Sequence, residues 1–225
     1  EGDRLPGIVV DRYGPQVLVE IDTPAAAPMA EAAGRIVAER LGVRVVGPGD
    51  AAAVEVEEHG VRFAVTPGAG HKTGLFLDQR DNRAAFARLV AGRTFLDAFS
   101  YVGAFSMHAL RAGSPSATLV DSAAPALEAA RRNAARNGID ATRIDYIAGD
   151  AFERLDAMAR QGRRFGAVVL DPPSFAPSER AKKKALVAYR RLNALGLRVA
   201  EPGAVFATSS CSSHVTVDEL VAALR

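Results

Sequence analysis

The amino-acid sequence predicts an α/β fold, in which a parallel sheet with helices on both faces follows a small α+β domain. Two observations predict it. Beyond residue 67, short apolar runs with the character of buried strands alternate with helical patterns, which is typical of a parallel sheet. Before that point, two segments with the alternation of β-hairpins flank an alanine-rich helical pattern. We therefore expect two domains, at residues 1–67 and 68–225.

The first domain is expected to be a hairpin, a helix and a second hairpin. Two β-rich runs at 7–14 and 16–22 are joined by a Gly-Pro turn. Apolar residues at helical spacing predict a helix over 28–41, followed by a glycine that stops it. Apolar and polar residues alternate across 54–65, on both sides of a turn that ends in glycine. Together these elements make a small α+β unit.

The second domain is expected to hold five strands, each followed by a helix. The strands are predicted at 94–99, 117–121, 145–150, 166–171 and 204–208. The helices are predicted at 78–90, 104–111, 122–137, 152–158 and 183–199, with a last one beginning at Thr216 or Val217. Ser122 is expected to be an N-cap.

The composition is that of an ordinary globular protein, with 48% hydrophobic and 24% charged residues. No apolar run approaches the roughly 18 to 20 residues that a membrane span needs, and the first residues carry no signal region. We therefore expect a cytoplasmic protein without a membrane partner. The single cysteine, Cys211, excludes an internal disulfide and a CxxC or zinc-finger site, so no metal is expected.

Polar side chains follow the predicted strands at the points where these strands end. Because ligands bind at the carboxyl ends of the strands in an open parallel sheet, one edge is expected to gather them. They are Asp97, Asp121, Asp150, Asp171 and Cys211. A single strand-end aspartate is often a helix cap, whereas the full series is hard to explain by capping alone.

The first strand–loop–helix segment, 97–106, has one glycine where a dinucleotide site needs GxGxxG, which weakens the case for a nicotinamide cofactor. S-adenosylmethionine carries no phosphate and requires only a turn, backbone amides and carboxylates. Asp121 is placed to accept from the ribose hydroxyls, and Asp150 from the adenine amino group. The cofactor-binding residues expected here are Asp97, Phe99, Tyr101, Gly103, Asp121, Ser122, Asp150 and Ala151.

The segment Asp171-Pro172-Pro173-Ser174-Phe175 predicts a stiff loop, because two prolines follow a buried strand. Such a loop can hold a flat ring against Phe175 and present Asp171 to its edge, as enzymes do with an extruded base. The alternative is a rigid strand-to-helix turn.

Cys211 lies in the polar run Thr208 to Ser213 and is the candidate nucleophile. The alternative is a packed thiol.

Four motifs together resemble a known family. They are GHKTGLFLDQRDNR at 70–83, FLDAFSYVGAFS at 95–106, DPPSF at 171–175 and SSCSS at 209–213. The chain resembles the bacterial large-subunit ribosomal RNA 5-methylcytosine methyltransferases, which have a Rossmann-like class I methyltransferase sheet behind a small α+β unit. Members also carry an N-terminal RNA-binding PUA domain and two further C-terminal strands, which a chain running from Glu1 to Arg225 is expected to lack.

The resemblance implies that Cys211 adds to C6 of a cytosine in 23S ribosomal RNA and that Asp171 is the acid at that base. It places Asp97, Gly103, Asp121 and Asp150 around S-adenosylmethionine. The glycines around His71-Lys72-Thr73 indicate a shaped loop near a ligand, and in this segment we expect cofactor contacts from Lys72, Gln79 and Arg80.

Three other functions stay open at this point. One is methylation of a nitrogen such as guanine N7 on the same scaffold, which needs no thiol. Another is a non-catalytic module that binds S-adenosylmethionine or RNA, using Lys182–Lys184 and the arginine pairs for phosphate contact. The least favoured is a nicotinamide-dependent oxidoreductase. RNA is the expected partner, and a homodimer stays open.

Overall fold

The computed structural model describes residues 6–46, 52–66 and 74–224. The chain divides into two compact units, Glu1–Arg80 and Asp81–Arg225. The sequence places a domain boundary between residues 67 and 68, and that position stays a prediction.

The first unit contains the predicted hairpin and helix, with one strand more than the sequence predicts. Strands β1 (Ile8–Tyr13) and β2 (Gln16–Ile21) pair antiparallel, and helix α1 (Ala27–Leu41) follows a short 3-10 turn. Strand β3 (Arg44–Val46) then pairs parallel to β2. A strand of three residues is too short to show a period-2 pattern, which is why the sequence did not predict it.

The second hairpin of this unit forms a separate two-stranded sheet from β4 (Val54–Glu58) and β5 (Val61–Val65). Its turn residues, His59 and Gly60, have φ angles of 48° and 79°. Two positive φ angles in a two-residue turn match the right-handed twist of the flanking strands. A 3-10 turn at Leu77–Gln79 ends the unit.

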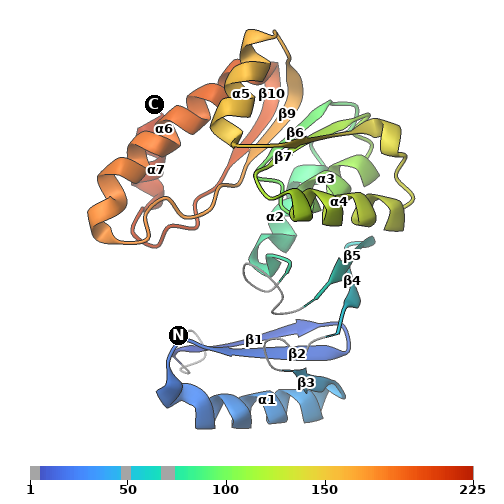
Figure 1. The fold of residues 1–225 in the computed structure, drawn as a ribbon, viewed down its shortest axis with the longest axis vertical. Coiled ribbons are helices and arrows are strands. Elements are labelled where there is room, and N and C mark those ends of the chain that lie inside the picture. The colour runs from blue at the N-terminus through green and yellow to red at the C-terminus, as the bar shows by residue number, and fades with distance from the viewer. Residues whose placement is uncertain (1–5, 47–51, 67–73, 225) are drawn as a thin grey trace. The chain divides into compact units, whose positions relative to one another are not determined.

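The second unit is built on a five-stranded parallel sheet in the order β10-β9-β6-β7-β8 (Figure 1). Its strands are β6 (Phe95–Ala98), β7 (Ala117–Asp121), β8 (Ile144–Ala148), β9 (Phe165–Leu170) and β10 (Ala200–Thr208). The chain runs outward from β6 through β7 to β8, and then returns to the other side of β6 as β9 and β10. The order therefore reverses between β6 and β9, the kind of position where open α/β sheets bind ligands.

Helices lie on both faces of this sheet, as the sequence predicts (Figure 1). They are α2 (Arg80–Ala87), α3 (Ala104–Arg111), α4 (Ala124–Arg136), α5 (Ala151–Arg160), α6 (Lys182–Val199) and α7 (Val217–Leu224). Helices α3 and α4 contact β6, β7 and β8, while α5 and α6 pack together and α6 contacts β9 and β10. None of the helices within the described residues has the length and hydropathy of a membrane-spanning segment.

Alternation along β6 sends its side chains to two different environments. Leu96 and Ala98 belong to a buried apolar cluster that includes residues of α5 and α6. Asp97 points the other way and bonds to Ser106 of α3. Strand β9 is buried at every position, as expected for a central parallel strand that is covered on both faces.

Most elements begin or end one or more residues from their predicted bounds, and three of the differences concern α2, α4 and β10. The helix predicted over 78–90 is the 3-10 turn at Leu77–Gln79 followed by α2, and α2 ends at Ala87. Ser122 is not the N-cap of α4, because the cap position is Ala123 and the carboxylate of Asp121 accepts from its backbone N–H. Strand β10 begins at Ala200, and its pairing with β9 is irregular between Ala200 and Val205.

Candidate functional site at the carboxyl edge of the parallel sheet

The predicted strand-end side chains do lie along one edge of the five-stranded sheet. Asp97 is within β6, Asp121 is the last residue of β7, and Asp171 directly follows β9. Asp150 comes two residues after β8, and Cys211 three residues after β10. Parallel pairing of all five strands brings these positions to the same side of the sheet.

Asp97 is a buried carboxylate with a perturbed proton affinity. Its side chain is 1% exposed, and its Oδ2 accepts from the Ser106 backbone N–H at 3.1 Å and from the Ser106 hydroxyl at 2.6 Å. The pKa of Asp97 is raised to about 7, chiefly by burial and partly by the negative charges of Asp171 and Asp121. This mutual effect indicates that three of the predicted carboxylates share one electrostatic environment.

The loop between β6 and α3 has an unusual backbone. Phe99 and Tyr101 have φ angles of 65° and 48°, a left-handed conformation that costs a residue other than glycine roughly 1–3 kcal/mol. Gly103 has a φ of 75°, and a Cβ there would lie 3.0 Å from the side chains of Ala130 and Leu119. The single glycine is therefore required by backbone conformation and by packing, and the strained loop has the features of a ligand-binding loop.

Asp121 braces this loop from the end of β7. Its Oδ2 accepts from the Tyr101 backbone N–H at 2.8 Å, and its Oδ1 accepts from the Ala123 backbone N–H at 2.8 Å. Asp150 is the N-cap of α5, and its Oδ1 accepts from the Glu153 backbone N–H at 3.1 Å. Both aspartates thus have structural bonds in addition to the cofactor roles that the sequence predicts for them.

The other predicted cofactor residues differ in their surroundings. Ser122 is exposed directly after β7, and Ala151 is buried as the first residue of α5. Gln79 ends the 3-10 turn of the first unit and Arg80 begins α2, and their contacts with the cofactor stay predictions. Lys72 lies outside the described residues.

Asp171 is half-buried where β6, β9 and β10 end side by side. Its backbone N–H donates to the Ala98 carbonyl at 3.3 Å, and the hydroxyl of Ser209 donates to its Oδ1. The backbone N–H of Ser209 in turn donates to the Leu170 carbonyl at 3.0 Å, which extends the β9–β10 ladder by one residue. The carboxylate is therefore held by the first residue after the neighbouring strand.

In the loop that follows Asp171, the ring of Phe175 packs against other aromatic side chains. Pro172 is buried, whereas Pro173 and Ser174 are exposed. The ring of Phe175 lies 4.9 Å from the ring of Tyr189, 6.0 Å from that of Phe152 and 6.5 Å from that of Phe99, measured between centroids. Only the remaining half-exposed part of Phe175 is accessible to a substrate.

Cys211 is exposed beside this loop. Its thiol contacts the Pro172 carbonyl at an Sγ–O distance of 3.9 Å. The thiol is therefore accessible, and it contacts the loop that begins with Asp171.

A network of hydroxyl groups surrounds Cys211, and the sequence did not predict it. Ser212 is 5% exposed, and its Oγ contacts the Ser174 hydroxyl at 2.9 Å, the Tyr189 hydroxyl at 3.0 Å and the Ala176 backbone N–H at 3.2 Å. The Ser210 hydroxyl donates to the Tyr189 hydroxyl at 2.8 Å. The run of serines around the cysteine was the available signal, but it indicated only a polar setting.

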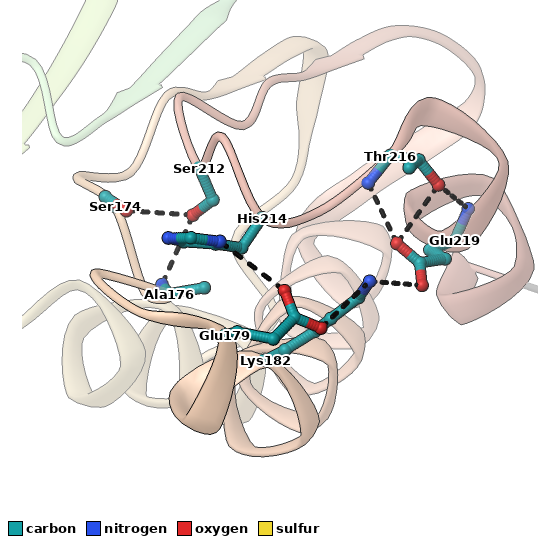
Figure 2. A network of polar contacts seen from close by, with 8 residues as sticks. All are labelled: Ser174, Ala176, Glu179, Lys182, Ser212, His214, Thr216 and Glu219. Atoms are coloured by element: carbon teal, nitrogen blue, oxygen red, sulfur yellow. Dashed lines mark hydrogen bonds and ion pairs between the residues drawn. The ribbon is translucent and has the colours of Figure 1, made fainter.

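Ion pairs extend this network to the starts of α6 and α7, as Figure 2 shows. Lys182 Nζ lies 2.7 Å from Glu219 Oε1 and 3.7 Å from Glu179 Oε1. His214 Nδ1 lies 3.4 Å from Glu179 Oε2. The backbone N–H and the hydroxyl of Thr216 both donate to Glu219 at 2.9 and 3.0 Å, which forms a capping box at α7. The loops after β9 and β10 are thus joined at several points.

Comparison with known proteins identifies the scaffold. Residues 45–218 match the family described as S-adenosylmethionine-dependent methyltransferase. The chain belongs to this methyltransferase family. Relatives include the proteins named ribosomal RNA large subunit methyltransferase I from Shewanella denitrificans and Pseudoalteromonas translucida, which are 35% and 34% identical over 97% and 94% of this chain. The chain spans 60% and 59% of the lengths of these two relatives.

Solved methyltransferases share its fold. The chain aligns with SMU.776, described as a methyltransferase in complex with SAH, at a TM-score of 0.84 and 23% identity, covering 97% of this chain and 61% of that one. The S-adenosylmethionine-dependent methyltransferase from Agrobacterium tumefaciens aligns at a TM-score of 0.75 and 19% identity, covering 98% of this chain and 75% of that one. These likenesses establish the class I methyltransferase fold.

The carboxyl edge fits the methyltransferase cofactor chemically. S-adenosylmethionine carries a positive sulfonium and an ammonium group, and the edge presents the carboxylates of Asp97 and Asp121. The Ser100 hydroxyl is buried in the strained loop and has no hydrogen-bond partner among the described residues, so a polar ligand atom would satisfy it. Residues 6–46, 52–66 and 74–224 contain no group of three or more His, Cys, Asp or Glu side chains arranged to hold a metal ion.

Proposed function

We propose that this methyltransferase forms 5-methylcytosine in large-subunit ribosomal RNA, with Cys211 as the nucleophile. The single observation that carries the proposal is the exposed thiol of Cys211 beside Pro172, in the loop that begins with Asp171. The names of the relatives support ribosomal RNA as the substrate. A thiol is required for carbon methylation, because C5 of cytosine is a poor nucleophile until a thiolate adds to C6.

The residues of this edge have separate tasks in the proposed reaction. The Cys211 thiolate forms a bond to C6, and the electrons of the C5–C6 double bond make C5 nucleophilic. Asp171, held by Ser209, acts in its protonated form and donates its proton to N3, which neutralises the negative charge that develops there. The cofactor, when bound, supplies an electrophilic methyl group to C5. A base, water in the simplest case, then takes the C5 proton while the bond between sulfur and C6 breaks. The sulfur leaves as a thiolate, N3 returns its proton to Asp171, and the aromatic base is restored.

The side chains proposed to hold the cofactor are those of the β6, β7 and β8 ends. Asp97 lies where the positive groups of the cofactor are expected, and Asp121 is proposed to accept from its ribose hydroxyls. Phe99, Tyr101 and Gly103 shape the loop that contacts the cofactor, and Asp150 with Ala151 is proposed to face the adenine ring. Pro172 and Pro173 keep the substrate loop rigid.

Most of the cationic clusters contain residues that form ion pairs with acidic side chains of the same chain. This favours an enzyme over a module that binds RNA by charge alone. Arg131 and Arg132 pair with Glu128, and Arg163 pairs with Asp145. In the lysine run, Lys182 contacts Glu179 and Glu219, whereas Lys183 and Lys184 are exposed. The exposed lysines are proposed to contact RNA phosphates. A cytoplasmic location and a homodimer stay predictions.

The test is the Cys211→Ala variant of the full-length protein. We expect it to bind S-adenosylmethionine as the wild type does, yet to form no 5-methylcytosine in large-subunit RNA, as measured by transfer of a labelled methyl group and bisulfite mapping. Wild-type enzyme and RNA that carries 5-fluorocytidine should yield a covalent complex that the variant does not form. Methylation that survives in Cys211→Ala would instead indicate a nitrogen target. A wild type that binds S-adenosylmethionine but methylates no RNA would indicate a non-catalytic module.

A further inference from the structure

Tyr189 occupies a central position behind Cys211. It belongs to α6, its side chain is fully buried, and its hydroxyl contacts the two residues on either side of the cysteine. The distances are 2.8 Å to Ser210 Oγ and 3.0 Å to Ser212 Oγ. One phenolic oxygen therefore bonds to two side chains of the cysteine loop, with Cys211 between them.

The hydrogen bonds around Tyr189 are consistent with one order of donors. Ser210 donates to the Tyr189 hydroxyl, which leaves that hydroxyl to donate to Ser212 Oγ. Ser212 Oγ also accepts from the Ala176 backbone N–H, so its own proton goes to Ser174 Oγ. In this order, each hydroxyl group of the series from Ser210 to Ser174 has a hydrogen-bond partner. A fully satisfied polar network in a buried setting specifies one arrangement of the groups that it joins.

The same side chain also fixes the loop on the substrate side. The Tyr189 ring lies 4.9 Å from the ring of Phe175, and Ser212 reaches Ser174 and Ala176 of the same loop. Tyr189 thus contacts the cysteine loop through its oxygen and the Asp171–Phe175 loop through its ring. Cys211 lies between the residues that make these contacts, with its Sγ 3.9 Å from the Pro172 carbonyl oxygen.

The ion pairs of Figure 2 hold a different part of the cysteine loop. Beyond Ser213, His214 contacts Glu179 and Glu219 contacts Lys182 at the start of α6, while Thr216 bonds to Glu219. These groups are exposed or half-exposed, where an ion pair contributes little to stability. The buried contacts of Tyr189 are therefore the ones that determine where Cys211 lies.

We infer that Tyr189 is a positioning residue for Cys211, whose hydroxyl holds the thiol in register with the Asp171–Phe175 loop. The inference rests on the proposed role of Cys211 as the nucleophile. Tyr189 itself touches neither the base nor the cofactor in this assignment. Its effect is on the rate of addition to C6, because a nucleophile that is misplaced by about 1 Å can lose about a hundredfold in rate.

The variant Tyr189→Phe of the full-length protein tests the inference, because it keeps the ring contact with Phe175 and removes only the hydroxyl. We expect kcat for RNA methylation to fall by about tenfold to a hundredfold, with the KM for S-adenosylmethionine unchanged. A second readout is the rate at which iodoacetamide alkylates Cys211, the single cysteine within residues 1–225, followed by mass spectrometry of the peptide that contains it. We expect that rate to change severalfold.

The matched control is Tyr146→Phe, which removes a hydroxyl from a half-buried tyrosine in β8, away from both loops. It should leave kcat and the alkylation rate as in the wild type. Ser212→Ala should resemble Tyr189→Phe, and Ser212→Thr should recover part of kcat because it keeps a hydroxyl. Thermal melting of each variant identifies any that fail to fold, and Ser210→Ala replaces Tyr189→Phe in that case.

Wild-type values of kcat and alkylation in Tyr189→Phe would overturn the inference, and so would an altered alkylation rate with an unchanged kcat. The proposed function is judged separately by Cys211→Ala. If that variant still forms 5-methylcytosine, the role of Cys211 is wrong, whereas the alkylation rate still reports whether Tyr189 positions the thiol.

Discussion

The two sides of the carboxyl edge hold their side chains by different means. On the β6–β8 side, the carboxylates accept mainly from backbone N–H groups: Ser106 to Asp97, Tyr101 and Ala123 to Asp121, and Glu153 to Asp150. On the β9–β10 side, the groups are held by side-chain hydroxyls, with Ser209 on Asp171 and the serines around Cys211 on Tyr189.

This difference determines how each side responds to substitution. A backbone donor cannot be removed by changing the side chain that carries it, so the β6–β8 side is sensitive mainly to changes of the aspartates themselves. A hydroxyl donor is lost in a single substitution, so the geometry of the β9–β10 side depends on several residues that need not touch the substrate. We therefore expect cofactor affinity and catalytic rate to respond to separate sets of variants.

The largest effect expected in this comparison is that of Asp171→Asn. The asparagine oxygen can still accept from Ser209, so the loop keeps its anchor, but the side chain can no longer donate a carboxyl proton to the base. We expect kcat to fall by about 10² to 10⁴, the range typical of a lost general acid or base, with unchanged affinity for S-adenosylmethionine. Steady-state kinetics with varied cofactor would measure both quantities. A variant that loses cofactor affinity instead would break the division between the two sides.

The next effect in size is that of Asp121→Asn on cofactor binding. Both oxygens of Asp121 accept from backbone N–H groups, so an amide must turn its NH₂ toward either Tyr101 or Ala123. We expect the affinity for S-adenosylmethionine to fall roughly tenfold to a hundredfold, because a hydrogen bond to a charged group is replaced by a repulsive contact. Isothermal titration calorimetry would measure the change. Asp145→Asn, which changes an exposed aspartate of β8 paired with Arg163, is the matched control and should bind normally.

The last effect concerns the pH dependence of stability through Asp97. Its pKa rises from 3.8 to about 7 on folding, so between these values the folded protein holds a proton that the unfolded chain releases. The free energy of unfolding should therefore fall as the pH rises through this window, by at most about 1.4 kcal/mol per pH unit, and level off above it. Asp97→Asn keeps an acceptor for Ser106 and should remove this component.

Urea unfolding of the cofactor-free wild type and of Asp97→Asn at pH 5, 6, 7 and 8 would measure this pH-dependent component of the free energy of unfolding. Parallel pH profiles for the two proteins would contradict the raised pKa. Addition of S-adenosylmethionine should flatten the wild-type profile, because a bound cation favours the ionised carboxylate.

The sequence predicted the sheet because buried parallel strands are nearly continuous apolar runs, as in Phe165–Leu170. It also predicted that the strand-end groups share an edge, since this follows from parallel pairing alone. It did not predict β3, which is too short to show periodicity. The prediction that Ser122 is the N-cap of α4 was wrong, because the Ala123 N–H donates to Asp121, and both residue types cap helices.

The contacts of Tyr189 were beyond the reach of the sequence for a different reason. Tyr189 and Ser212 are 23 residues apart, and they meet only because β10 lies next to β9 and α6 covers both. Tyr189 lies at helical spacing from Leu186 and Leu192, and such a pattern indicates a buried ring without showing whether its hydroxyl has a partner. Such contacts depend on tertiary arrangement, which periodicity does not encode.

The irregular pairing at the start of β10 determines where the length of this strand can vary. Between Ala200 and Val205 the ladder with β9 shifts, and Gly203 has a φ of 76°, so a residue gained or lost there is absorbed in the bulge. From Val205 to Thr208 the pairing with β9 is regular. An insertion between Val205 and Thr208 would turn the side chains that follow it to the opposite face and change the position of Cys211. Insertions and deletions should therefore be tolerated in the first half of β10 and not in the second.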